Sequence, residues 1–332
     1  MTDRKADPTD PEMLAALREQ LPPGEDLLSL DRFIRCALYH PSVGYYQRKR
    51  ERVGRRDDTD FYTASSLGPV FARLVVAASV RLLDDDPGQY SFVELGPESE
   101  TGILGRVPDH PFRDSILVRP GESFNIPSRS VVFSNEVFDA QPFRRLVWNG
   151  QEWRESGVRI RENGLEWDFL PSVENLPPLP RDLPAGYTVD WPEEAHGLMK
   201  DLCFRPWQGL FLAFDYGLDR ATVLAERPEG TGRTYAGHSM GSDLLARPGE
   251  TDITCHVIWD ELEAIARKQG FEEPVLEHQE SFFMHHAAEA IQSILAGEPD
   301  GFSPRKQTLM ELLHPANMGR KFQVLRARRR EI

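Results

Sequence analysis

Apolar residues in the first 85 positions recur at helical spacing. Asp10 is a suitable N-cap and Pro11 suits the first helical position, so the pattern predicts a helix that begins here. The apolar face of this helix carries Met13, Leu14, Leu17 and Leu21. The same spacing predicts two further helices, over residues 30–38 and 67–82. We therefore expect a helical N-terminal segment over residues 1–85.

Short apolar runs replace this pattern from residue 86 onward. Three runs bounded by Gly, Pro, Asn or Asp predict buried strands, at residues 90–95, 130–133 and 209–214. Strands that are apolar on both faces are typical of parallel sheets, because helices cover both sides of such sheets. Two later runs, residues 275–284 and 322–325, predict strands that form an antiparallel pair at an edge. The chain is therefore expected to be an α/β protein with a Rossmann-like sheet.

Residues 144–206 interrupt the α/β pattern. Trp148, Trp153 and Trp167 lie in segments in which polar and apolar residues alternate, and a Pro-rich stretch at residues 176–180 follows them. Alternation of this kind predicts strands with one buried face. We expect an inserted β-hairpin region and a crossing loop within an α/β domain that spans residues 86–332.

Composition narrows the classes of function and location. The net charge of the 332 residues is −14, which argues against a nucleic-acid-binding protein because such proteins need clustered positive charge. The three cysteines are far apart and lack metal-ligand spacing, which is typical of free thiols in a reducing compartment. No apolar run approaches the roughly 20 residues that cross a bilayer, and the first residues lack a secretory signal. We expect a cytoplasmic protein that binds neither membranes nor nucleic acid.

Polar residues follow the three predicted buried strands, at the end where open α/β sheets bind ligands. Residues 94–97 (Glu-Leu-Gly-Pro) follow the first strand, and a glycine there permits a close approach of the backbone to a cofactor. Residues 135–142 and 215–217 follow the other two, and their carboxylates suit a cationic group. The alternative is that these acids lie at helix N-termini and complement the helix dipole.

A long polar segment, residues 230–257, contains repeated glycines and is rich in Arg, His, Asp and Thr. Long polar loops in compact domains are usually functional or disordered, and the apolar residues within this one favour an ordered loop. His238 and His256 suggest a metal site, but no third ligand has a suitable spacing. No metal is therefore predicted.

Taken together, these segments resemble the MidA-type family of class I S-adenosylmethionine-dependent methyltransferases. That family includes the mitochondrial arginine methyltransferase that assists the assembly of respiratory complex I. The matching stretches keep the family's order and spacing over nearly the whole chain. They are residues 33–46, 60–64, 94–97, 135–142 (Asn-Glu-Val-Phe-Asp-Ala-Gln-Pro), 215–217, 230–238, 248–257 and 318–325.

The resemblance implies a seven-stranded class I methyltransferase sheet, with S-adenosylmethionine over the ends of its first and fourth strands. It implies an insertion between strands four and five, which would border the substrate cleft together with the N-terminal segment. The implied reaction is methyl transfer to a nitrogen of an arginine side chain in a protein partner. Proximity and orientation contribute most to a displacement of this kind.

The resemblance also implies roles for individual residues. It assigns the cofactor contacts to Thr63, Glu94, Gly96, Pro97 and Asn135. Glu136 and Asp139 are expected to act in catalysis, because a guanidinium needs carboxylates that orient it and balance its charge. Substrate contacts are expected from Tyr235, His238, Asp252 and His256.

Two departures from the family pattern support a second hypothesis. The second and third glycines of the family's first turn are replaced by Glu98 and Glu100. Each like-charge contact with the cofactor's carboxylate would cost about 4 kcal/mol at ~4 Å and an effective dielectric of ~20. The region 97–134 is also short, and Glu122 is a poor candidate for the ribose contact. The alternative is therefore a catalytically inactive relative that serves as a binding or assembly module.

Overall fold

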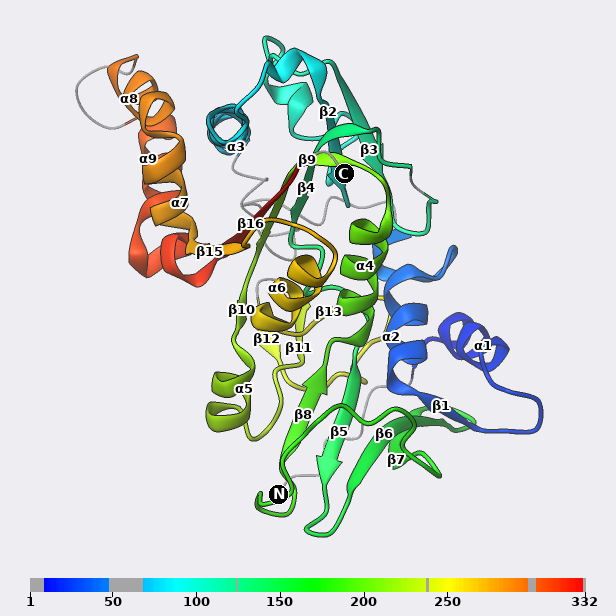
Figure 1. Ribbon diagram of the computed structural model, residues 1–332. Coiled ribbons are helices and arrows are strands. Elements are labelled where there is room, and N and C mark those ends of the chain that lie inside the picture. The colour runs from blue at the N-terminus through cyan, green and yellow to red at the C-terminus, as the bar shows by residue number, and fades with distance from the viewer. Residues whose placement is uncertain (1–8, 48–67, 124, 237–238, 298–302, 331–332) are drawn as a thin grey trace.

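Six strands form the central sheet of the computed structural model, which describes residues 9–47, 68–123, 125–236, 239–297 and 303–330 (Figure 1). Their spatial order is β15 (Val275–His278), β16 (Gln323–Arg329), β9 (Gln208–Asp215), β4 (Arg129–Asn135), β2 (Ser91–Leu95) and β3 (Asp114–Val118). The last four of these are parallel, whereas β16 is antiparallel to β9 and to β15. The three buried strands and the antiparallel pair at the edge are therefore confirmed.

Within the described residues the central sheet has six strands, so the seven that the family resemblance implies is wrong for this part of the chain. Only residues 119–128 join β3 to β4, which lie on opposite sides of β2. A further strand with its own crossover connection would need about a dozen more residues. β3 is therefore the edge of the sheet.

Helices cover both faces of the sheet (Figure 1). One face is covered by α3 (Pro69–Leu82), α7 (Gln279–His286), α8 (Ala288–Ala296) and α9 (Pro304–Leu313). The other face is covered by α4 (Glu193–Phe204) and α6 (Trp259–Lys268). In the first layer, the rings of Phe71, Phe214 and Phe283 lie 5.5–6.0 Å apart and join two helices to the sheet. This two-sided burial explains why the parallel strands are apolar on both faces.

Residues 275–284 form a strand and a helix, so the prediction of one strand here is wrong. β15 ends at His278, and α7 begins at Gln279, whose buried amide donates a hydrogen bond to Leu312 O at 3.0 Å. Phe282 and Phe283 are adjacent and both fully buried. Consecutive residues of a strand point to opposite faces, whereas α7 buries both rings among the sheet and its neighbouring helices. Periodicity alone does not separate strand from helix in so short an apolar run.

The insertion lies between β4 and β9 in the sequence. Together with part of the N-terminal segment it forms a second sheet. Its strands are β1 (Leu27–Ser29), β6 (Trp153–Ile160), β5 (Arg144–Trp148) and β8 (Thr188–Trp191), with β7 (Leu165–Phe169) beside β6. Two helices pack against this sheet, α1 (Pro11–Glu19) and α2 (Leu30–Tyr39). The Asp10 side chain caps α1 by accepting a hydrogen bond from Glu12 N at 2.9 Å, as predicted.

A further group of short strands and one helix follows β9 and precedes α6 in the sequence. They are β10 (Gly217–Leu218), α5 (Arg220–Glu226), β11 (Arg233–Ala236), β12 (Ser239–Gly241), β13 (Asp252–Thr254) and β14 (Val257–Ile258). β11 pairs with β12 and β13, so the long polar segment is ordered as predicted where the structure describes it. Among the helices of the described ranges, none combines the length and apolar character needed to span a membrane.

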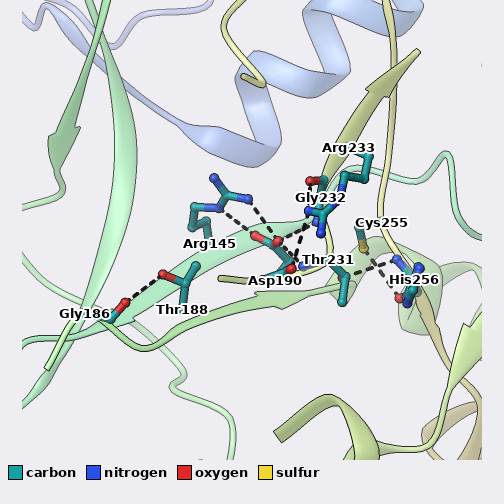
Figure 2. Close-up of polar contacts among 10 residues, drawn as sticks. Arg145, Gly186, Thr188, Asp190, Thr231, Gly232, Arg233, Cys255 and His256 are labelled. Carbon is teal, nitrogen blue, oxygen red and sulfur yellow. Dashed lines mark hydrogen bonds and ion pairs between the residues drawn. The ribbon is translucent and has the colours of Figure 1, made fainter. Parts of the chain in front are cut away.

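A buried ion pair ties the long polar segment to the insertion. The Asp190 carboxylate on β8 accepts hydrogen bonds from Arg145 Nε at 2.8 Å and Nη2 at 3.0 Å (Figure 2). The same carboxylate accepts the backbone N–H groups of Thr231 at 2.8 Å and Gly232 at 2.7 Å. The Thr231 hydroxyl in turn accepts His256 N–H at 3.3 Å. The start of β11 and the end of β13 are therefore both positioned from β8.

Asp190→Ala is expected to lower the free energy of unfolding by about 3–5 kcal/mol, because it leaves Arg145 and two backbone donors buried without their acceptor. Urea titration at neutral pH measures this change. The control is Glu166→Ala, which removes the exposed partner of Arg161 and should cost far less. Equal losses in the two variants would contradict the role given to Asp190.

Candidate functional site

A cavity of about 1490 Å³ opens at the carboxyl ends of β2, β3 and β4. The neighbours of β2 on its two sides, β3 and β4, both follow it in the sequence, so the strand order reverses here. Open α/β sheets bind ligands at such a point because the chain leaves it in opposite directions. The opposite wall comes from α2, β11, β13 and the residues after β9. The cavity therefore joins the central sheet to the N-terminal segment and the long polar segment.

Most of the residues that the sequence singles out line this cavity. They are Gly96, Pro97, Asn135, Glu136, Asp139, Tyr235, Asp252 and His256. Glu94 is not among the lining residues, and Thr63 and His238 lie outside the described residues. Segments up to about 160 positions apart in the sequence thus meet in one place.

The turn after β2 depends on Gly96. Its φ is +62°, in the left-handed region that favours glycine, and its N–H donates to Val118 O at 2.9 Å. A Cβ at this position would lie 2.8 Å from Cγ2 of Val137, which follows β4. Gly96 therefore lets the turns after β2 and β4 approach each other beneath the cavity.

Glu94, on β2, supports the turn that follows this strand. Its carboxylate accepts Ile103 N–H at 2.7 Å, and a Cβ on Gly102 would collide with the same carboxylate. Burial, together with the charge of Glu98, raises the pKa of Glu94 from its ordinary 4.5 to about 7, against the lowering effect of the Ile103 hydrogen bond. The predicted cofactor residue is thus placed to hold the 96–103 segment.

The two glutamates that replace family glycines lie in different surroundings. Glu98 lines the cavity, and its charge contributes to the raised pKa of both Glu94 and Glu136. The side chain of Glu100 is 95% exposed and accepts a hydrogen bond from Arg119 Nη2 at 3.0 Å. The expected like-charge contact with the cofactor's carboxylate therefore applies to Glu98 alone, because the side chain of Glu100 lies in solvent and does not line the cavity.

The turn after β4 carries two of the expected site residues. Glu136 is a non-glycine residue with φ of +52°, a strained conformation that its N–H holds by donating to Phe214 O at 2.9 Å. Asn135 Nδ2 donates to Glu136 Oε1 at 3.1 Å. Burial raises the pKa of Glu136 well above its ordinary value, and the charges of Asp139 and Glu98 add to this effect.

Asp215 at the end of β9 holds the same turn in place. Its Oδ2 accepts the N–H groups of Phe138 at 3.0 Å and Asp139 at 3.2 Å, and its Oδ1 accepts Tyr216 N–H at 2.9 Å. Burial outweighs these hydrogen bonds and raises the pKa of Asp215 to about 7. The pKa of Asp139 is also raised well above its ordinary value, by burial and by the charge of Asp215. Asp215 is thus a positioning residue. We singled out residues 215–217 from the sequence but did not predict this role for Asp215.

Tyrosine hydroxyls form much of the wall opposite the sheet. Tyr39 OH donates to Ala140 O at 2.8 Å, and Tyr46 OH donates to Asp252 Oδ1 at 2.9 Å. The two rings are stacked with centroids 5.3 Å apart. Tyr216 OH donates to Thr254 Oγ1 at 2.6 Å. Our sequence reasoning did not assign Tyr39, Tyr46 or Tyr216 to the site, although all three lie in stretches that match the family.

Three buried polar atoms of cavity-lining residues have no hydrogen-bond partner among the described residues. They are Asn135 Oδ1, Asp139 Oδ1 and His256 Nδ1. Burial lowers the pKa of His256 to about 4, so this imidazole is neutral. Leaving a buried polar group unsatisfied costs about 1–3 kcal/mol, which favours a ligand that supplies partners. The two oxygens suit donors such as ammonium or guanidinium groups.

Comparisons with known proteins identify a family and a similar fold. Residues 88–275 match a family model described as putative S-adenosyl-L-methionine-dependent methyltransferases. A crystal structure from Burkholderia thailandensis, described as a "likely methyl transferase" bound to S-adenosylhomocysteine, is 22% identical with a TM-score of 0.82. The match covers 96% of this chain and 94% of that one. A native crystal structure of an uncharacterized protein from the same organism gives 22% identity, a TM-score of 0.79 and the same coverage. A search of curated proteins finds no match.

The free energy of unfolding is expected to depend on pH through Glu94. Its pKa is higher in the folded state than in the unfolded chain, so the proton stabilises the fold below about pH 4.5 and this stability is lost as the pH rises to about 7. Relative to Glu94→Gln, the wild-type protein should lose about 3 kcal/mol at most across this range. Urea titrations of both proteins at several pH values measure the difference. Parallel curves for the two proteins would contradict the raised pKa.

Proposed function

The chain belongs to the family of S-adenosyl-L-methionine-dependent methyltransferases whose model matches more than half of it, and we propose that it methylates a nitrogen of an arginine side chain in a protein partner. The observation that carries the proposal is one cavity in which a cofactor-type turn meets buried carboxylates and tyrosines. The cofactor residues come from the ends of β2, β3 and β4, whereas the acidic groups come from the turn after β4 and from β13.

The cofactor end of the cavity fits an S-adenosylmethionine molecule. Gly96 and Pro97 present backbone close to the cavity, and the unsatisfied Asn135 Oδ1 is an acceptor for an ammonium group. Arg106 lines the same end and supplies positive charge for a carboxylate, while Glu98 opposes it. When bound, the cofactor supplies a sulfonium methyl group for an in-line displacement.

The other end of the cavity is suited to a guanidinium. Glu136, Asp139 and Asp252 provide carboxylates, and the tyrosine rings beside them provide faces on which a flat cation can stack. The raised pKa values of Glu136 and Asp139 describe carboxylates without a cation, and a bound guanidinium would favour their charged forms. The nitrogen that accepts the methyl group must lose a proton. Asp139 Oδ1, which has no hydrogen-bond partner among the described residues, is the group we assign to receive it.

A catalytically inactive relative is the less favoured alternative. This alternative is based partly on the negative charges of Glu98 and Glu100 next to the cofactor's carboxylate. The charge of Glu100 is paired with Arg119 in solvent, whereas Glu98 lines the cavity and still opposes binding. The unsatisfied acceptors Asn135 Oδ1 and Asp139 Oδ1 and the ordered turn after β4 support a ligand-binding site under either hypothesis. The protein partner and a cytoplasmic location stay predictions.

The first test measures binding of S-adenosylhomocysteine by calorimetry. Glu98→Gln removes one negative charge from the cavity without changing side-chain size, and should tighten binding by at least about tenfold. Glu100→Gln is the matched control, and should change the affinity by less than about twofold because its side chain lies in solvent. Absence of binding to both the wild-type protein and Glu98→Gln would favour the inactive relative.

The second test measures methyl transfer by mass spectrometry, with a peptide that contains one arginine and a matched peptide in which lysine replaces it. We expect methylation of the arginine peptide alone. Asp139→Asn should lower the rate by about 10²- to 10⁴-fold, as for the loss of a general base, while S-adenosylhomocysteine binding is kept. Methylation of the lysine peptide at an equal rate, or full activity of Asp139→Asn, would contradict the assignment.

A further inference from the structure

Two histidines and a glutamate meet at the edge of the central sheet, outside the lining of the cavity. Glu277 lies on β15, and His285 and His286 are the last two residues of α7 (Figure 1). His285 Nδ1 lies 2.9 Å from Glu277 Oε1, and His286 Nε2 lies 3.2 Å from Glu277 Oε2. One ligand atom from each residue lies within 4.8 Å of the other two. None of the three residues lines the cavity.

We propose that Glu277, His285 and His286 bind a divalent transition metal ion, of which zinc is the best-suited class. Two imidazoles and one carboxylate are a donor set that zinc accepts readily. With metal–ligand bonds of about 2.0–2.1 Å, neighbouring ligands of a tetrahedral site lie about 3.3 Å apart. The separations of 2.9 and 3.2 Å run from the two rings to different oxygens of the Glu277 carboxylate, and one ligand atom from each of the three residues lies within 4.8 Å of the others. Side-chain shifts that bring these three atoms around one ion therefore complete the site.

The surroundings of the three side chains favour a cation on one side of the cluster. α7 ends at His286, and the carbonyl groups at a helix C-terminus attract positive charge. The side chains of Glu277 and His286 are 13% and 16% exposed, whereas His285 is 65% exposed. The exposed side next to His285 leaves the fourth position to water.

Arg326 on β16 sets the strength of the site. Its Nε donates to Glu277 Oε2 at 2.8 Å, which orients the carboxylate in the way that outer partners orient metal ligands. Its positive charge also repels a metal ion, so we infer weaker binding than in a closed structural zinc site. On binding, the metal takes the place of the proton on His285 Nδ1 and on His286 Nε2. A neutral ring then carries its proton on the other nitrogen, and a protonated ring releases one proton to solvent.

Calorimetry of the untagged full chain with zinc chloride, after treatment with a chelator, tests the proposal. We expect one zinc ion per chain, and His285→Ala and His286→Ala should each weaken binding by more than about tenfold. His40→Ala removes a histidine at the end of α2, outside the cluster, and serves as the matched control with unchanged affinity. Thermal unfolding of each variant without metal identifies any that fails to fold.

Two further measurements do not depend on the stability of the histidine variants. Cobalt bound to the wild-type protein should show the visible absorption of a tetrahedral site, and zinc should displace it. Arg326→Gln should tighten zinc binding, because it removes the opposing charge and keeps a hydrogen-bond donor. Absence of heat at millimolar zinc, or equal zinc affinity in the wild-type protein and both histidine variants, would overturn the proposal. The site is independent of methyl transfer, so its failure leaves the proposed function standing.

Discussion

The carboxylate of Asp215 is the contact on which the geometry of the cavity depends. It lies at the end of β9 and binds the backbone N–H groups of Phe138 and Asp139 in the turn after the neighbouring strand β4. The Glu136 N–H donates to Phe214 O on the same strand, so β9 also holds the left-handed conformation of Glu136. These hydrogen bonds fix the backbone of the turn, and the fixed backbone places Glu136 and Asp139 in the wall of the cavity. Because β4 and β9 are neighbours in the sheet, Asp215 can hold the turn after β4, and this turn positions the side chains of Glu136 and Asp139.

This arrangement brings three buried carboxylates together. Glu136, Asp139 and Asp215 each have a pKa above the ordinary value, chiefly because of burial. The charge of Asp215 adds to the raised pKa of Asp139 and of Glu136. Proteins keep such groups when they are protonated, paired or in contact with a cation. The unsatisfied Asp139 Oδ1 shows that hydrogen bonds from the described residues do not fully satisfy the cluster. A cationic ligand is the simplest way to satisfy the cluster, which connects the electrostatics of the cavity with the proposed substrate class.

The sequence predicted the parts of the fold that local pattern controls. β2, β4 and β9 follow from apolar runs, and five of the expected site residues line the cavity because the ends of parallel strands meet at one edge. It did not predict features that depend on partners distant in the chain. The outward orientation of Glu100 requires Arg119, the inward position of Glu94 requires Ile103, and the wall of Tyr39 and Tyr46 requires α2 to pack beside β13. The helix at Gln279 likewise depends on burial of Phe282 and Phe283 under neighbouring helices.

The ion pair of Asp190 and Arg145 extends this dependence to the insertion. Asp190 lies on β8, yet its carboxylate binds the backbone of Thr231 and Gly232, and Thr231 binds that of His256 (Figure 2). Tyr235 and Asp252, which line the cavity, are paired residues of β11 and β13, directly beyond these contacts. Movement of the insertion sheet would therefore move the wall that faces the sheet-bound carboxylates. The insertion is part of the site through backbone hydrogen bonds, although its own strands contribute none of the residues that line the cavity.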